Sequence, residues 1–126
     1  MKAPHETTCL VVDDSAVIRK VARRIIEALG MNVSEAEDGS AALEVCAASM
    51  PDAILLDWNM PNMDGYTFLQ ALRQSEGGGV PKVLFCTTEN DVGAIARALR
   101  AGADEYIMKP FDRQIVLSKF EEIGLC

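Results

Sequence analysis

The sequence predicts a doubly wound α/β domain, in which helices cover both faces of a parallel sheet. Apolar, β-branched runs alternate with segments of helical periodicity along all 126 residues. Several of these runs are apolar on both faces of the predicted strand, as in parallel sheets that are buried on both sides. The length suits a single domain with a sizeable core.

The first half of the chain predicts three strands and two helices. The strands are short apolar runs, and in the first helix apolar residues recur at helical spacing until Gly30 ends it. The elements in order are a strand over 8–12, a helix over 17–29, a weaker strand over 33–36, a helix over 39–49 and a buried strand over 53–56.

The second half continues the alternation with three helices and two strands. A loop of sequence SEGGGVP separates the first of these helices from the next strand, and Gly102 closes the following helix. The elements in order are a helix over 66–74, a strand over 82–86, a helix over 92–99, a strand over 105–108 and a helix over 115–123.

Composition excludes several classes of function. The net charge of −7 argues against nucleic acid as the main partner, because phosphates would be repelled. Apolar runs are too short for a membrane span, and the N-terminus, MKAPHETT, lacks the apolar core of a signal peptide. We therefore expect a cytoplasmic protein. The cysteines are far apart, so neither a zinc site nor a redox motif is expected: Cys9, Cys46, Cys86 and Cys126.

Polar side chains stand at the carboxyl ends of the predicted strands, where the functional crevice of a doubly wound sheet lies. Each has an ordinary structural explanation when taken alone; Asp14, for example, could cap a helix. Three crowded carboxylates, however, repel one another and require protons or a cation, and an oxygen-lined site suits Mg²⁺. The residues at these ends are Asp13, Asp14, Asp57, Thr87, Thr88 and Lys109.

This arrangement suits phosphoryl chemistry. A Mg²⁺ ion beside Asp57 would screen an incoming phosphoryl group, while Thr87 and Lys109 could bind its other oxygens. Asp57 would then act as a carboxylate nucleophile that attacks phosphorus and forms an acyl phosphate.

Four motifs, VVDDS, LLDWNMPNMDG, CTTEN and YIMKPF, resemble the receiver domain of two-component response regulators in their order and spacing. The resemblance covers essentially the whole chain. It implies a flavodoxin-like fold with strand order 2-1-3-4-5, a receiver domain over 8–126 and a short polar arm over 1–7. The single-domain chemotaxis members are especially similar, around Asp57 and at Glu89, Tyr106 and Phe111.

The resemblance also implies a role for each matching position. A histidine kinase would phosphorylate Asp57, and Lys109 would pair with the phosphoryl group while Thr87 follows it inward. The Lys109–Pro110 bond would be cis. The Mg²⁺ ligands would be Asp14 and Asp57 directly, Asp13 through water, and Asn59 through its backbone carbonyl.

The predicted output surface consists of the fourth helix, the fifth strand and the fifth helix, and Tyr106 would report phosphorylation by changing rotamer. If Ile107 packs inward, alternation along the strand turns Tyr106 and Met108 outward, beside Val92 and Phe111. Thr88 and Val92 differ from the residues usual in chemotaxis members, and both lie near this surface. Its charged rim would comprise Glu89, Asp91 and Lys119.

These features predict a phosphorylation-controlled switch that catalyses only its own phosphorylation and dephosphorylation. Because no residues remain for an output domain, we expect a monomer that signals by protein contact, with the flagellar motor switch as the downstream partner. The alternative is a phosphate sink or phosphorelay shuttle.

Three other classes fit less well. An aspartyl-phosphate phosphatase of the haloacid dehalogenase type normally has a second aspartate two positions after its nucleophile, where this chain has Asn59. A flavodoxin-like electron carrier needs a first loop that binds phosphate, and Asp13 and Asp14 would repel one. A purely structural interaction module is disfavoured because every position of the site is filled.

Overall fold

The computed structural model describes residues 7–58, 60, 62–87 and 92–125. Five strands alternate with five helices, as the sequence predicts. Their bounds are β1 Thr8–Val12, α1 Ala16–Ala28, β2 Asn32–Ala36, α2 Gly39–Ala48, β3 Ala53–Asp57, α3 Gly65–Gln74, β4 Lys82–Thr87, α4 Val92–Ala101, β5 Glu105–Met108 and α5 Arg113–Glu122.

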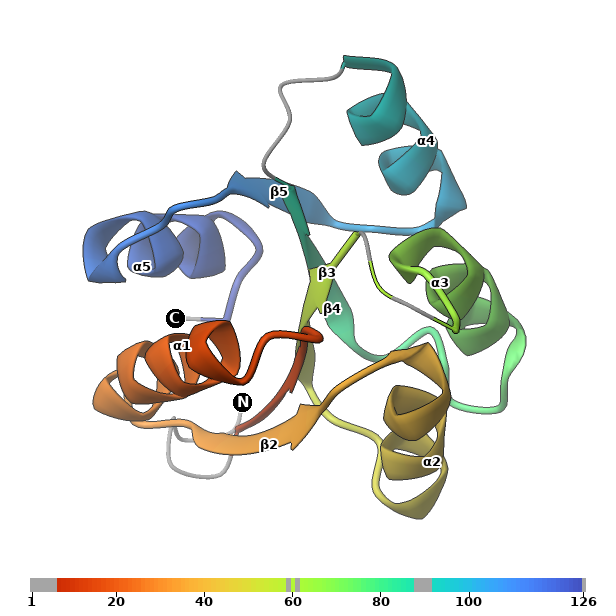
Figure 1. Cartoon of the computed structure of the whole chain (residues 1–126), viewed down its shortest axis with the longest axis horizontal. Coiled ribbons are helices and arrows are strands. Elements are labelled where there is room, and N and C mark those ends of the chain that lie inside the picture. Colours follow the sequence, from red (N-terminus) through yellow and green to blue (C-terminus); the bar gives the residue numbers. More distant parts are fainter. Residues whose placement is uncertain (1–6, 59, 61, 88–91, 126) are drawn as a thin grey trace.

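The strands form one parallel sheet in the order β2-β1-β3-β4-β5, which confirms the predicted topology (Figure 1). Asp57 at the end of β3 is in register with Cys86 of β4, and Thr87 at the end of β4 is in register with Met108 of β5. The carboxyl ends of the central strands therefore meet at one edge of the sheet. This edge carries the polar residues that the sequence singled out.

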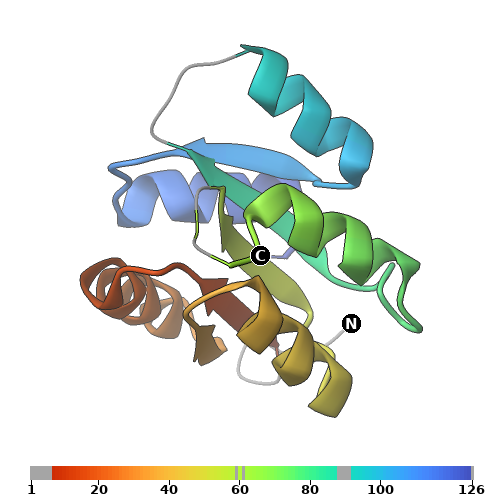
Figure 2. The same cartoon turned by 45° about the vertical axis from the view of Figure 1, so that its right-hand side comes forward.

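Two hydrophobic cores lie on opposite faces of the sheet, with α1 and α5 over one face and α2, α3 and α4 over the other (Figures 1 and 2). Alternation along β1 divides its side chains between them: Leu10 and Val12 lie in the core beneath α2, α3 and α4. Cys9 and Val11 lie in the core beneath α1 and α5. Apolar residues on both faces of the strands are the physical reason for helices on both sides.

Four of the helices begin at a side chain that caps the first turn. The carboxylate of Asp64 accepts a hydrogen bond from the backbone N–H of Thr67 at 2.8 Å, so this acid starts α3 rather than joining the site. At α1 the capping residue is Ser15, whose hydroxyl accepts from the N–H of Ile18. Asp14 is thereby left exposed at the sheet edge. The other two capping residues are Asp38 and Asp112.

The cysteines that the structure describes are free and buried: Cys9, Cys46 and Cys86. Burial raises the pKa of the Cys9 thiol to about 12, so this sulfur remains protonated near neutral pH. In the described part of the chain, no helix has the length and apolar character needed to cross a bilayer.

Candidate functional site

Three carboxylates meet at the carboxyl edge of the sheet. Asp13 follows β1, Asp57 ends β3, and Asp14 begins the turn into α1. One carboxylate oxygen from each of the three lies within 4.8 Å of the others. Asp13 and Asp57 are only 4% and 7% exposed, whereas Asp14 faces solvent. The sequence therefore predicted correctly which acids come together.

The backbone and side chain of Asp13 are fixed by neighbours on β2 and α1. Its N–H donates to the carbonyl of Ala36 at 3.1 Å, and its carboxylate accepts from the N–H of Ser15 at 2.9 Å. Arg19 donates from Nη1 to the carbonyl oxygen of Asp13 at 2.7 Å and from Nε to Glu35 at 3.0 Å. The first loop is thus held on both sides before any ligand binds.

Lys109 places a positive charge between two of the acids. Its Nζ donates to Asp13 Oδ2 at 2.7 Å and to Asp57 Oδ1 at 3.0 Å. The residue is positioned just after β5 by a hydrogen bond from its backbone N–H to the carbonyl of Thr87 at 2.9 Å. The peptide bond between Lys109 and Pro110 is cis, as the sequence resemblance implies.

The electrostatics of this group leave Asp57 as an unusual carboxylate. Burial raises its pKa above the ordinary value, and the negative charges of Asp13 and Asp14 act in the same direction, while Lys109 opposes them. Burial lowers the pKa of the Lys109 ammonium, but its hydrogen bonds to the two carboxylates outweigh this, and the pKa is raised. The cation therefore stays charged between two acids.

The donor set fits a hard divalent cation. Lys109 supplies one positive charge to three clustered acids, so the site retains an excess of negative charge at neutral pH. Asp14 lines a hollow of about 320 Å³ together with Glu37, Asp38 and Asn62, which leaves room for water on the solvent side. Carboxylate oxygens with space for water are what Mg²⁺ requires. Asn59, the fourth predicted ligand, lies outside the described residues.

A comparison with protein-family models settles which family this chain belongs to. Residues 9–121 match the model described as the response regulator receiver domain. The chain belongs to the response regulator receiver family. Members of this family are signalling proteins rather than enzymes that turn over external substrates.

Individual receivers with similar sequences include chemotaxis proteins. The chemotaxis protein CheY of Pseudomonas aeruginosa is 36% identical over 115 residues, with 90% of this chain and 93% of that protein covered. The response regulator MprA of Mycolicibacterium vanbaalenii is 38% identical over 114 residues, and this chain spans about half (48%) of its length. The match therefore extends to both single-domain and longer regulators.

Solved receiver structures have the same fold. The chemotaxis protein CheY4 of Vibrio cholerae superposes with a TM-score of 0.88 at 30% sequence identity, with 93% of this chain and 98% of that chain covered. The agreement extends across nearly the whole of both chains. It confirms the flavodoxin-like sheet that the sequence motifs imply.

Trp58 connects the receiver's acidic site to the α3 side of the domain. Its ring packs edge-on against Phe85 of β4 with centroids 4.7 Å apart, and against Tyr66 of α3 at 5.9 Å. Its backbone carbonyl accepts a hydrogen bond from the N–H of Gly65 at 3.1 Å. Because Trp58 adjoins Asp57 and is partly buried, its fluorescence is a suitable reporter of events at the site.

The predicted output residues pack on different cores. Ile107 is fully buried beneath α1 and α5, and Tyr106 points to the opposite face, as strand alternation predicts. On that face Tyr106 is partly buried against the core beneath α2, α3 and α4. Phe111 packs against the core on the other face. Both side chains are also partly exposed, and their membership of one output surface stays a prediction.

Of the charged residues predicted to surround the output surface, the structure describes Lys119. Lys119 lies over the ring of Tyr106, with Nζ 4.5 Å from the centroid, and also pairs with Glu105 at 3.6 Å. Glu89 and Asp91, together with Thr88, lie outside the described residues. The cation over the aromatic face holds Tyr106 at the junction of β5 and α5.

Sequence reasoning missed two residues that shape the site. Arg19 braces Asp13, and its position one helical turn after Ser15 was a usable signal. Gly65 approaches the backbone of β3 so closely that a Cβ there would lie 2.6 Å from the carbonyl oxygen of Asp57. A glycine that opens a helix next to a site residue often marks such a close approach.

Proposed function

We propose that this chain is a phosphorylation-controlled signalling switch, in which Asp57 accepts a phosphoryl group from a histidine kinase. The observation that supports this most is the pairing of Lys109 with both Asp13 and Asp57 inside a cluster of three acids. The cluster offers a nucleophile, a cation for phosphoryl oxygens and oxygen ligands for Mg²⁺ at one point.

Each residue of the site has one part in the proposed transfer. The carboxylate of Asp57 attacks phosphorus, and the bond between phosphorus and the donor's leaving atom breaks as the acyl phosphate forms. Lys109, already beside Asp57, moves its hydrogen bond to an oxygen of the phosphoryl group. The buried Thr87, at the end of the adjacent strand, offers its hydroxyl to another oxygen.

Mg²⁺ fits this site through Asp13, Asp14 and Asp57, with the carbonyl of Asn59 as the remaining expected protein ligand. When bound, the ion supplies charge neutralisation at the phosphoryl oxygens. The chain's own residues perform the remaining steps: Asp57 provides the nucleophilic oxygen, and Arg19 keeps the Asp13 loop in place. No turnover of external substrates is proposed, because the product is the modified protein itself.

A direct test is phosphorylation by a small donor. Purified protein incubated with acetyl phosphate and Mg²⁺ should gain the mass of one phosphoryl group, and Asp57→Asn should gain none. The adduct should be lost in hydroxylamine, since an acyl phosphate is labile where a phosphoserine is not. Labelling of Asp57→Asn at Ser15 or Thr87 would refute the assignment.

Chemotaxis is the leading proposal for the pathway. A chemotaxis protein of nearly the same length, from Pseudomonas aeruginosa, is 36% identical, which favours the flagellar motor switch as the partner. The proposed contact face is formed by α4, β5 and α5, with Tyr106 as its responsive residue. Capture with phosphorylated and unphosphorylated protein should recover a motor component only in the first case.

A shuttle or phosphate sink is the second candidate, and the surface of α1 favours it. This helix exposes Val17 and Val21, whose accessible fractions are 71% and 44%, on the side where Lys20 and Arg24 also face solvent. An exposed apolar stripe of this kind favours docking of another protein. Capture of a phosphotransfer protein in place of a motor component would favour this candidate.

A further inference from the structure

A hollow of about 460 Å³ lies between the C-terminal ends of α2 and α3. The two helices lie side by side and both begin at the carboxyl edge of the sheet, so their C-terminal ends lie away from the acidic site (Figures 1 and 2). The size of the hollow is within the range of sites for small molecules. Its lining is mainly apolar, with two polar residues on the α3 side: Leu43, Cys46, Ala47, Met50, Ser75 and Glu76.

The α3 side of the hollow is formed by the first residues of the glycine-rich loop over 75–81. Three consecutive glycines would ordinarily make such a loop flexible. Here the hydroxyl of Ser75 donates to the carbonyl of Leu72 at 2.6 Å, and the N–H of Gly78 donates to the carbonyl of Ser75 at 3.0 Å. Gly78 packs so closely that a Cβ there would lie 1.6 Å from the carbonyl oxygen of Leu72. The hollow therefore has a preformed wall.

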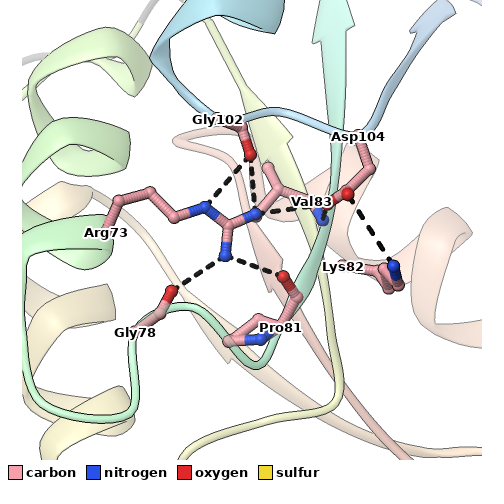
Figure 3. A network of polar contacts seen from close by, with 7 residues as sticks. All are labelled: Arg73, Gly78, Pro81, Lys82, Val83, Gly102 and Asp104. Atoms are coloured by element: carbon pink, nitrogen blue, oxygen red, sulfur yellow. Dashed lines mark hydrogen bonds and ion pairs between the residues drawn. The ribbon is translucent and has the colours of Figure 1, made fainter.

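Arg73, in the last turn of α3, holds the same loop through its guanidinium (Figure 3). Its Nη1 donates to the carbonyl oxygens of Gly78 and Pro81, both at 2.8 Å. Its Nε and Nη2 donate to the carbonyl oxygen of Gly102 at 3.0 and 2.7 Å, and Nη2 also reaches Asp104 at 3.2 Å. These contacts form the Arg73 network. The guanidinium is thereby engaged, and it does not line the hollow.

The electrostatic surroundings of the hollow favour a cation. α2 and α3 both end there, and the C-terminal end of a helix carries partial negative charge. α2 has no basic residue in its last turn, and the guanidinium of Arg73 in the last turn of α3 is bound elsewhere. Glu76 is exposed beside the hollow, and among the described residues it has no ion-pair or hydrogen-bond partner. The negative charge at the hollow is thus not neutralised by the chain itself.

We infer that this hollow binds a small organic cation with an apolar body, of the class of the alkylamines and arylalkylamines. Leu43 and Met50 pack against the core and provide an apolar surface for the body of the ligand. The ammonium group would meet the carboxylate of Glu76 and the hydroxyl oxygen of Ser75. The inference goes beyond the proposed function and does not depend on it, because the hollow shares no residue with the acidic site.

The test compares three probes that carry the same phenyl ring on a short chain: phenethylamine, phenethyl alcohol and hydrocinnamate. Their head groups are cationic, neutral and anionic near neutral pH. Each is titrated into the full, unmodified chain without Mg²⁺, and NMR follows ¹³C-labelled methionine methyl groups. The signal of Met50 is assigned with Met50→Leu, and Met31, buried on the other face of the sheet, is the internal reference.

Phenethylamine should shift the Met50 signal in a saturable manner and leave that of Met31 unchanged. Phenethyl alcohol should bind about fivefold more weakly, because it lacks the charge that Glu76 and the helix ends attract. Hydrocinnamate should bind more weakly still. The order of the three affinities therefore reports the sign of the charge that the hollow accepts.

Two variants locate the binding. Glu76→Gln should remove most of the preference for the amine over the alcohol, whereas Glu44→Gln, which changes an exposed acid of α2 outside the lining, should behave as the wild type. Ala47→Leu adds a larger side chain at an exposed position of the lining and should weaken the binding of all three probes.

Three results would overturn the inference. The first is the absence of a saturable shift at Met50 with phenethylamine. The second is equal affinity of the wild type for the amine and the alcohol, which would show that charge is not recognised. The third is binding that is unchanged in Ala47→Leu, which would place the probe outside the hollow.

Discussion

At the scale of single residues, the most important feature is the ammonium group of Lys109, which lies between the carboxylates of Asp13 and Asp57. Lys109 lies 2.7 Å from Asp13 and 3.0 Å from Asp57, so the unmodified site is held closed by an ion pair. A phosphoryl group on Asp57 would bring new oxygens to the same cation. The contact that stabilises the resting site is thus the one that phosphorylation would rearrange.

Removing this cation should destabilise the protein in a way that Mg²⁺ corrects. Lys109→Met leaves Asp13 and Asp57 buried without their positive partner, and we expect a loss of about 2 kcal/mol in the free energy of unfolding without metal. Saturating Mg²⁺ should recover much of it. Urea unfolding of both proteins with and without Mg²⁺ measures the effect. Lys82→Met, which removes a half-exposed lysine, is the control. A variant that Mg²⁺ does not stabilise more than the wild type would contradict this role of Lys109.

Glu35 offers a prediction about pH. Hydrogen bonds from Arg23 lower its pKa, burial opposes them, and Arg19 adds to the lowering. A carboxyl group whose pKa is lower in the folded state than in the unfolded state stabilises the fold at pH values above its ordinary pKa. This stabilisation is lost as the pH falls through the lowered pKa. Glu35→Gln should therefore cost less than about 1 kcal/mol near pH 7, and the cost should vanish in acid.

Unfolding curves of Glu35→Gln from pH 7 down to a pH below the lowered pKa would measure this difference, with exposed Glu44→Gln as the control. Because Arg19 also braces Asp13, Glu35→Gln should slightly weaken Mg²⁺ binding. A cost of Glu35→Gln that stays constant down to the lowest pH would show that the ion pairs are not its source.

At the scale of secondary structure, the connection between β3 and α3 adjoins the acidic site. Asp57 ends the strand, Asp64 caps the helix, and Gly65 packs its Cα against the backbone between them. The Asp57 side chain itself is held by the hydrogen bond from Lys109 Nζ at 3.0 Å. The close packing of the connection leaves no room for a larger residue at 65.

Gly65→Ala should therefore distort the acidic site, although Gly65 is not one of its polar residues. The added Cβ would lie 2.6 Å from the Asp57 carbonyl oxygen, so the turn must shift, at a cost of about 1–3 kcal/mol. Gly79→Ala is a matched control, because its Cβ would meet nothing within 4 Å. Thermal unfolding gives the stability, and titration of Trp58 fluorescence with Mg²⁺ gives the affinity. Equal behaviour of the two variants would contradict the close approach at Gly65.

The elements were largely predictable from sequence because the signals that define them are local. β1, β3 and β4 are continuous apolar runs, and the residues at their ends fall together as a consequence of parallel topology. The Arg73 network was not predictable, since it joins residues 29 positions apart through backbone carbonyls that any sequence possesses. The partial burial of Tyr106 was not predicted, because alternation along a strand gives the face on which a side chain lies but not how far the helix over that face covers it.

At the scale of the whole molecule, the sheet separates two cores, and the predicted output residues fall on different sides of it. Tyr106 packs with the core under α4, whereas Phe111 packs with the core under α5. A signal that moves α4 can therefore alter the surroundings of Tyr106 without repacking Phe111. We expect phosphorylation to act through Thr87 on the ring of Tyr106 and to shift a population that already exists in the free protein.

Tyr106→Ala tests this route at the level of partner binding. A half-buried aromatic residue at an interface is a frequent anchor, so the variant should lose about 2 kcal/mol of affinity for the partner recovered by capture. Its phosphorylation by acetyl phosphate should be unaffected, because Tyr106 packs against the core rather than on the acids. Calorimetric titration of the phosphorylated proteins gives the difference. Phe111→Ala serves as the comparison, and equal losses for the two would contradict separate roles for the two faces.

The assignment of Asp57 as the phosphorylated residue is best tested by locating the modification in the chain. Protein treated with acetyl phosphate and Mg²⁺ is reduced with borohydride, which converts an acyl phosphate of aspartate to homoserine, and is then digested for mass spectrometry. We predict homoserine at position 57 alone, and none when Mg²⁺ is withheld by a chelator. Homoserine at Asp13, Asp14 or Asp64, with position 57 unmodified, would show that the assignment is wrong.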